Sequence, residues 1–216
     1  MTTRELFLAR VTRRLEDGIP DNPLRPLLDV PSDPIDYTMD LTNLPGVFRT
    51  AAEAAGAEVI DTDEAALGAV LLGIIERIGS GATVALSDEM VCNSLAERLE
   101  DEGVRPAPVL EPAPLSGVSL GVTGATAGVA LTGSIIIDSS VPGARVVSLL
   151  PETHLVVLRR SDIVPTPGSF LRRLGSWQDA LPSNLVLITG PSRSADIELQ
   201  LTIGVHGPGR LVVALI

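Results

Sequence analysis

The stretch LVLITGPSRSADIELQ, residues 185–200, predicts a strand, a tight turn and a helix in succession. Residues 185–188 form a short apolar run rich in β-forming side chains, which is typical of a parallel strand buried on both faces. The run stops at Gly190-Pro191, and the polar residues after it open an amphipathic segment. Similar alternations of apolar runs and helical patterns recur from residue 47 onward. They indicate βαβ units and therefore an α/β fold with a mostly parallel sheet.

The turn within this stretch is a candidate anion-binding loop. Gly190 lets the backbone bend sharply, and Ser192, Arg193 and Ser194 stand where the helix is expected to begin. The first N–H groups of a helix lack intrahelical partners and lie at the positive end of its dipole, so they can bind a phosphate or carboxylate. Arg193 would add a planar, bidentate donor. Alternatively, Ser194 is only a helix cap and Arg193 a solvated surface side chain.

The composition narrows the function classes. The chain has 216 residues, a formal net charge of −11 and 2% aromatic residues, which argues against a surface for nucleic acid or an anionic membrane. All 16 basic residues are arginine, which excludes a Walker-type phosphate loop and Schiff-base chemistry. Residues 29–102 carry 16 acidic side chains against 3 arginines, whereas residues 103–216 carry 7 against 8. Residues 103–216 would therefore bind an anionic ligand more favourably than residues 29–102.

The N-terminal region is expected to differ from the rest of the chain. A helix is predicted from Thr3 to about Gly18, and a Pro-rich run from Pro20 to Pro45 is typical of an extended arm. We therefore divide the chain into an N-terminal helix and arm, residues 1–45, and an α/β domain, residues 46–216. Arginines interrupt the apolar residues of the N-terminal helix, so neither a signal peptide nor membrane insertion is predicted, and a cytoplasmic location is expected.

The remaining patterns predict the order of the other elements. Helices are expected at residues 47–55, 62–78, 87–102, 143–150 and 168–175. Strands are expected at residues 57–60, 82–86, 105–110, 154–158 and 211–216, with two further β-like runs inside 118–138. Because the last run is apolar throughout, we expect it inside the sheet.

Small residues beside the two β-like runs are a second candidate for ligand contact. Gly124 and Gly133 let the backbone approach a ligand, and Thr123 and Thr132 place hydroxyl groups next to them. Hairpin and bulge geometry would explain the same glycines. Because ligands of open parallel sheets bind beyond the carboxyl ends of the strands, we expect these turns to converge there with the turn at Thr189.

The two histidines and the one cysteine differ in their expected roles. His206, beside Gly207 in a Gly-rich turn, could reach the same crevice as Arg193 as an anion contact or proton donor, or could bond nearby backbone. His154 begins an apolar strand, where a structural role is favoured. Cys92 is expected to be a buried, inert thiol. The spacing of these residues indicates no metal site.

Five motifs follow one another in a recognisable order: VTGATAGVALTGSIII, RVVSLLPETHLVVL, IVPT, ITGPSRSADIE and GVHGPGRLVV. Over roughly residues 40–216 they resemble the lactate-utilisation protein C family, the LUD-domain proteins. The resemblance implies a three-layer, Rossmann-like α/β fold similar to that of the sugar-phosphate isomerase and CoA-transferase superfamily. It also implies a role in the bacterial oxidation of L-lactate to pyruvate, beside an iron–sulfur LUD-domain protein and a cysteine-rich subunit.

Within that family, this chain departs from the usual pattern at two positions. The family often carries acidic residues where this chain has Thr126 and Leu131. The related transferases use a glutamate nucleophile, and nothing in this sequence marks an equivalent, so we assign no catalytic residue. One cysteine cannot hold an iron–sulfur cluster alone, so we expect no cofactor in this chain and a cluster in a partner protein.

Two functions of different classes remain open. The first is an accessory subunit of a lactate-oxidising complex, with a site for a small anion or a partner. The second is a stand-alone enzyme of the isomerase or transferase type, acting on a phosphorylated or carboxylated metabolite. The missing acidic positions and the absence of lysine favour the first.

Overall fold

The structure is a computed structural model that describes residues 39–107, 117–174, 182, 184–195, 201–204 and 206–216. These residues belong to one compact unit, Met39–Ile216. The predicted N-terminal helix, most of the Pro-rich run and part of the strand predicted at 105–110 lie outside the described residues. The division of the chain at residue 45 stays a prediction.

The helices fall close to where the sequence patterns place them. They are α2 (Leu44–Ala54), α3 (Leu67–Ile78), α4 (Met90–Asp101), α5 (Ala144–Leu149) and α6 (Pro167–Leu174), with a 3-10 turn η2 (Arg160–Asp162).

The start points of α2 and α3 differ from those predicted for local reasons. α2 begins inside the Pro-rich run because Pro45 suits the first turn of a helix, where its missing N–H is not needed. The side chain of Asn43 caps the N-terminal end of α2 by accepting a hydrogen bond from the N–H of Gly46. α3 begins at Leu67, five residues later than predicted. The carboxylate of Asp63 instead accepts a hydrogen bond from the N–H of Ala66 and so stabilises a turn before the helix.

The main sheet is parallel throughout. Its strands, in spatial order, are β1 (Glu58–Asp61), β11 (Arg210–Leu215), β6 (Thr153–Leu158), β3 (Leu120–Gly124) and β2 (Val84–Leu86). β11 lies inside the sheet between β1 and β6, which confirms the expectation drawn from its apolar sequence. Among the described residues, the strand predicted at 105–110 is represented only by a bridge from Ala107 to Ala85.

A second, mixed sheet has the order β7 (Ile163–Val164), β4 (Ala127–Val129), β5 (Ser134–Asp138) and β8 (Leu185–Ile188). The β-like runs predicted inside 118–138 therefore divide between the two sheets. The prediction of a parallel strand buried on both faces at 185–188 is wrong. β8 pairs antiparallel with β5 at the edge of this sheet, and the side chain of Leu187 is 56% exposed.

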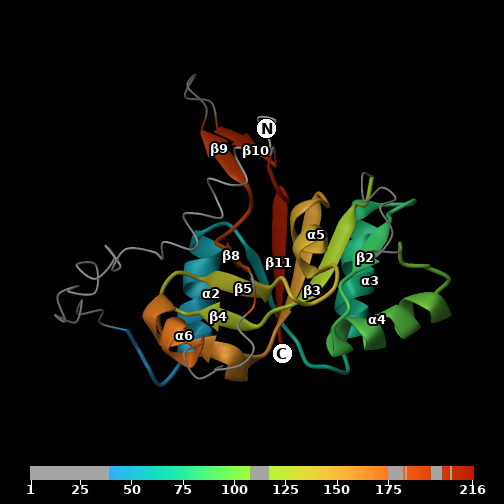
Figure 1. Cartoon of the computed structure of the whole chain (residues 1–216). Coiled ribbons are helices and arrows are strands. Elements are labelled where there is room, and N and C mark those ends of the chain that lie inside the picture. Colours follow the sequence, from blue (N-terminus) through green and yellow to red (C-terminus); the bar gives the residue numbers. More distant parts are fainter. Residues whose placement is uncertain (1–38, 108–116, 175–181, 183, 196–200, 205) are drawn as a thin grey trace, which may run out of the picture. The chain divides into compact units, whose positions relative to one another are not determined.

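Both faces of the main sheet are covered, which gives the three-layer arrangement. Leu71 of α3 and Leu95 of α4 pack on one face against Leu155 and neighbouring side chains. Phe48 of α2 and Ile135 of the second sheet pack on the opposite face. Figure 1 shows α3 and α4 on one side of β11 and β3, with α2, β4 and β5 on the other.

The segment after β8 forms a hairpin strand where a helix start was expected. β9 (Arg193–Ala195) pairs antiparallel with β10 (Leu201–Ile203). Ser192, Arg193 and Ser194 therefore do not begin a helix, and the prediction of an anion site at a helix N-terminus here is wrong. Any anion binding by this turn must come from its side chains and loop backbone.

Candidate functional site

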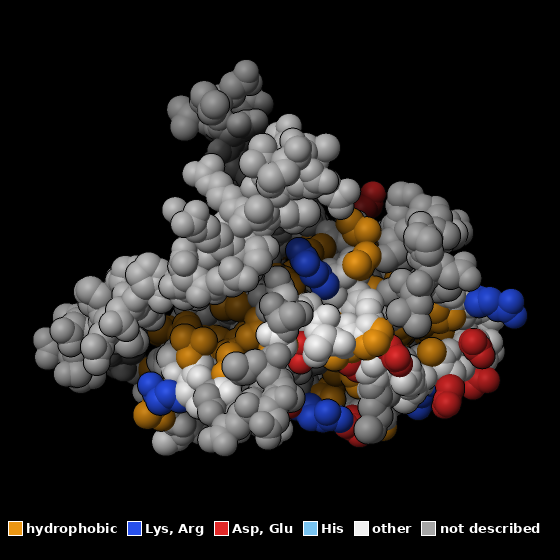
Figure 2. Space-filling model, viewed as in Figure 1, with side chains coloured by type: hydrophobic (Ala, Val, Ile, Leu, Met, Phe, Trp, Pro, Cys, Tyr) orange, Lys and Arg blue, Asp and Glu red, His pale blue; other side chains and the backbone are white. Residues whose placement is uncertain are grey.

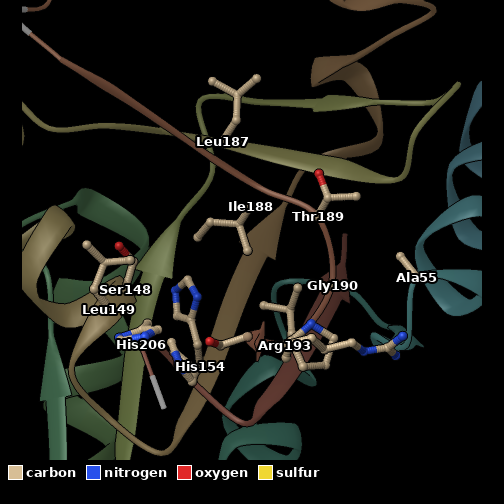
Figure 3. A pocket seen from close by; sticks show the side chains of 15 residues that line it. Ala55, Ser148, Leu149, His154, Leu187, Ile188, Thr189, Gly190, Arg193 and His206 are labelled. Atoms are coloured by element: carbon tan, nitrogen blue, oxygen red, sulfur yellow. The ribbon is translucent and has the colours of Figure 1, made fainter. Parts of the chain in front are cut away.

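A crevice of about 540 Å³ lies where the second sheet meets the amino ends of two central strands of the main sheet. Its walls come from residues 187–193, the end of α5, the first residues of β6 and β11, and the turn at 206–208. We call it the histidine crevice because His154 and His206 both line it (Figure 3). Its volume falls in the range of small-ligand pockets, roughly 300–1,000 Å³.

Arg193 lies at the other end of the crevice from the histidines. Its guanidinium lies directly against Gly56, and Figure 3 shows it directed toward Ala55 and away from His154 and His206. Gly56 has a φ of +96°, and a side chain at this position would collide with the guanidinium. Arg193 is exposed, and none of the carboxylates that the structure describes pairs with it. Its charge is therefore available to a ligand.

His154 forms the buried wall of the crevice. It is the second residue of β6 and is fully buried. Its Nε2 atom lies 2.9 Å from the Oγ1 atom of Thr123 on the neighbouring strand β3, whereas its Nδ1 atom has no hydrogen-bond partner within the described part of the chain. Burial lowers the pKa of His154 to about 3, so the imidazole is neutral near pH 7.

Ser192 and the turn at 206–208 connect the two ends of the crevice. The N–H of Ser192 donates a hydrogen bond of 2.9 Å to the carbonyl of Pro208. A Cβ atom on Gly207 would lie 3.4 Å from the Cβ of Ser192, so the two loops approach closely. His206 is exposed, which leaves its imidazole accessible to a ligand.

The charge of the histidine crevice is unusual for this acidic chain. Its described lining contains Arg193 and two histidines, and no Asp or Glu. Four other crevices between described residues each contain a carboxylate, which belongs to Glu152, Glu89, Asp88 and Glu64 respectively. Figure 2 shows acidic side chains gathered over α4, a helix on the opposite face of the main sheet. Of these five crevices, the histidine crevice alone has a basic residue and no carboxylate in its described lining, which favours an anion.

Half of the predicted binding residues meet in this crevice. They are Gly190, Ser192, Arg193, His206 and Gly207. Their proximity agrees with the expectation that His206 could reach the crevice of Arg193, although their binding of a ligand stays a prediction.

The other predicted binding residues lie elsewhere. Thr123 contacts the crevice only through His154, and Ser194 lies in β9. Gly124 ends β3 at the far end of the sheet, and Gly133 packs against the backbone of α2. The Oγ1 atom of Thr132 lies 2.7 Å from the hydroxyl of Ser134, which in turn lies 2.7 Å from the hydroxyl of Thr189.

The expected convergence of these turns at the carboxyl ends of the strands is wrong. The histidine crevice lies at the amino ends, since His154 and Leu211 are each the second residue of their strands. Thr189 lines this crevice, Gly124 lines a different one, and Thr132 lines neither. The second sheet explains the error, because Thr132 and Thr189 flank its strands β5 and β8 and so lie away from the carboxyl ends of β3 and β6.

Glu89 was missed by the sequence analysis, which interpreted residues 87–89 only as the start of a helix. Its Oε2 atom accepts hydrogen bonds from the hydroxyl of Ser87 and, at 2.8 Å, from the N–H of Gly124. A crevice of about 160 Å³ lies beside it and includes Thr126 and Arg159. This smaller crevice lies at the carboxyl ends of β3 and β6, where ligands of α/β sheets usually bind.

Cys92 is buried, as predicted. Burial, together with the charge of Glu89, raises the pKa of its thiol well above the usual range. Within the described residues, no group of three or more His, Cys, Asp or Glu side chains could hold a metal ion. In the same residues, no helix combines the length and apolar character needed to cross a bilayer.

Comparison with known proteins agrees with this architecture. The LUD domain family model matches residues 114–216. A crystal structure of a DUF162 family protein from Deinococcus radiodurans superimposes with a TM-score of 0.58 and 23% sequence identity, covering 82% of this chain and 98% of that chain. The fold is therefore that of a Rossmann-like, three-layer α/β domain.

Sequence relatives identify the family more closely. Lactate utilization protein C of Bacillus licheniformis is 31% identical over 189 residues, which cover 80% of this chain and 77% of the relative. Lactate utilization protein C of Exiguobacterium sp. is 29% identical over 225 residues, which cover 100% of this chain and 96% of the relative. The protein YkgG of Escherichia coli is 31% identical over 166 residues, which cover 72% of this chain and 71% of the relative. The chain belongs to the lactate utilisation protein C family of LUD-domain proteins.

Proposed function

We propose that the protein takes part in bacterial lactate utilisation, the oxidation of L-lactate to pyruvate, as an accessory subunit that binds a small organic anion in the histidine crevice. Support for the process comes from relatives named lactate utilization protein C that cover most of the chain. The single observation that carries the binding site is the lining of the crevice, which joins Arg193 and two histidines without a carboxylate. In a chain of net charge −11, such a lining favours an anion.

The accessory role rests on the cysteine count. Oxidation of lactate releases two electrons, and iron–sulfur clusters that would accept them are typically held by about four protein ligands, mostly cysteines. This chain has one cysteine, Cys92, which lies on the buried face of α4. We therefore expect the cluster in partners, an iron–sulfur LUD-domain protein and a cysteine-rich subunit. Apolar side chains exposed at or near the crevice, Leu150 and Leu187, are available for such contacts.

Thermal unfolding tests the anion site. The wild type, Arg193→Ala and His206→Ala would be unfolded with lactate, pyruvate, phosphate and longer organic acids, because a ligand that binds the folded state raises its Tm. We expect a selective rise for an acid in the wild type that is lost in Arg193→Ala. Arg105→Ala is the matched control, since Arg105 is also exposed but does not line the crevice. Equal rises in Arg193→Ala and the wild type would refute the site.

Affinity purification from a cell that grows on lactate tests the accessory role. The full chain, tagged at one end, should retain a protein with an iron–sulfur absorption spectrum, and the isolated chain should not oxidise lactate with an artificial electron acceptor. Lactate oxidation by the isolated chain would contradict an accessory role.

A second candidate function, a stand-alone enzyme, is favoured by Glu89. Three donors converge on one of its carboxylate oxygens, from Ser87, Gly124 and Cys92, and hold it beside the crevice at the carboxyl ends of the strands. A carboxylate fixed in this way could act as a general base or a nucleophile. Glu89→Gln would then abolish any activity of the isolated chain on phosphorylated or carboxylated metabolites, while an accessory subunit would have no such activity to lose.

A further inference from the structure

The unpartnered Nδ1 atom of His154 is the feature that the anion site does not explain. Buried polar atoms in folded proteins nearly always have a hydrogen-bond partner, and Nδ1 has none among the described residues, so a water molecule or a ligand in the crevice can supply one. The Oγ1 atom of Thr123 lies 2.9 Å from Nε2 and so fixes the orientation of the ring. Nδ1 is therefore the nitrogen left for a ligand.

The chemistry of that nitrogen suits a hydroxyl group. Burial lowers the pKa of His154 to about 3, so its imidazole brings no positive charge to the crevice near pH 7. Depending on which way the hydroxyl of Thr123 is oriented, Nδ1 is a donor or an acceptor. A hydroxyl group can satisfy either case, because it both donates and accepts. The anion itself would bind at the other end, where Arg193 carries a permanent charge.

The crevice has room for a molecule larger than lactate. Six non-hydrogen atoms at no more than about 30 Å³ each would occupy at most about 180 Å³. The crevice has a volume of about 540 Å³. Apolar side chains of Leu187, Ile188 and Leu211 also line the crevice and favour an apolar chain. The lining thus combines a cation at one end, apolar side chains, and a neutral hydrogen-bonding atom at the other end.

We propose that the histidine crevice binds a hydroxy acid longer than lactate, with its carboxylate at Arg193, its carbon chain along Ile188 and its hydroxyl hydrogen-bonded to Nδ1 of His154. The proposal rests on the proposed anion-binding function and adds to it a second, uncharged subsite.

Nitrogen NMR on the full chain tests the subsite directly. The protein contains two histidines, so a long-range ¹H–¹⁵N spectrum contains two imidazoles, and His206→Gln assigns them. The probes are sodium hexanoate and its terminal-hydroxy analogue. The hydroxylated acid is expected to bind about tenfold more tightly, as one added hydrogen bond predicts, and to shift the Nδ1 resonance of His154. Hexanoate is expected to leave that resonance unchanged.

Two substitutions of His154 separate its nitrogens. Asparagine places an amide near the position of Nδ1, whereas glutamine reaches the position of Nε2 and can keep the contact with Thr123. His154→Gln should therefore bind both probes equally, and His154→Asn should retain part of the tenfold preference. If either variant fails to fold, the shift of the Nδ1 resonance in the wild type still decides.

The outcomes distinguish the two proposals. Binding of both acids with equal affinity and no shift of Nδ1 would overturn the subsite and leave the anion site intact. Preference for the hydroxylated acid that persists in a folded His154→Gln would also overturn it. Failure of every acid to bind would overturn the anion site, and the subsite with it.

Discussion

Thr123 and His154 form a hydrogen bond 2.9 Å long between two neighbouring strands of the main sheet, and both side chains are fully buried. The pair lies on the face of the sheet covered by α5. His154 is the register partner of Gly121 on β3, and the missing side chain of Gly121 leaves room for the carbonyl of Val147 in α5. Since Nε2 of His154 is held by the sheet itself, the imidazole that lines the crevice is oriented before any ligand binds. The orientation of this imidazole therefore depends on Thr123, which does not itself line the crevice.

Thr123→Val should lower the free energy of unfolding by about 1–3 kcal/mol, because the isosteric side chain leaves Nε2 of His154 buried without a partner. The measurement is urea unfolding at pH 7. Thr123→Ser is the matched control, since it keeps the hydroxyl group and loses one methyl group. A valine variant as stable as the serine variant would show that the hydrogen bond contributes nothing.

The pKa of His154 predicts a loss of stability in mild acid. The unfolded chain binds a proton at this histidine below about pH 6.5, whereas the folded chain does so only near pH 3. The stabilisation is complete above pH 6.5 and is lost as the pH falls, at up to about 1.4 kcal/mol per pH unit. His154→Gln should reduce this slope between pH 6.5 and pH 5, as measured by urea unfolding. His206→Gln, at an exposed site, should keep it. Equal slopes in the wild type and His154→Gln would contradict the prediction.

Gly133→Ala should prevent folding or lower the free energy of unfolding by more than about 3 kcal/mol. Gly133 has a φ of +62°, and an added Cβ would collide with the backbone of Ala51 and Ala52 in α2. Gly103→Ala separates this collision from the cost of the left-handed backbone alone, because Gly103 has a φ of +77° with open space around it. The free energy of unfolding of Gly103→Ala should fall by only about 1–2 kcal/mol. Similar losses in the two variants would mean that α2 moves aside without difficulty.

Cys92 should react slowly with a disulfide reagent in the folded protein. Burial and the neighbouring Glu89 raise the pKa of its thiol, which keeps it protonated at pH 8, and the side chain is fully buried. Absorbance at the wavelength of the released thiolate measures the rate, with guanidinium-unfolded protein as the reference. We expect the folded protein to react more than about tenfold more slowly. Comparable rates would place the thiol at the surface.

The sequence patterns predicted the main sheet well, because its central strands are buried on both faces and their apolar runs are continuous. β11 is the clearest case, with five buried residues in succession. β8 shows the limit of the same argument. Its four apolar residues suit any strand. The local sequence does not indicate that β5 is its partner or that the side chain of Leu187 is exposed. The partner of a strand is set by tertiary structure.

The candidate site was predicted in part for a similar reason. Gly190 and Gly207 marked two flexible turns, and a backbone hydrogen bond from Ser192 to Pro208 brings these turns together. The polar cluster after Gly190 resembled a helix cap, yet its residues form one strand of a hairpin, so the local capping preference was overruled. The contact between Thr123 and His154 depends on the pairing of β3 with β6, which no local pattern contains.

The position of β11 also constrains how the protein is made. Val59 of β1 pairs with Val213 of β11, and β1 has no other partner strand among the described residues. On the ribosome, β1 and β6 emerge before residues 210–215, so each must wait with an unpaired edge until β11 has been made. The nascent chain is therefore expected to depend on chaperones, and to aggregate when translation stalls before β11.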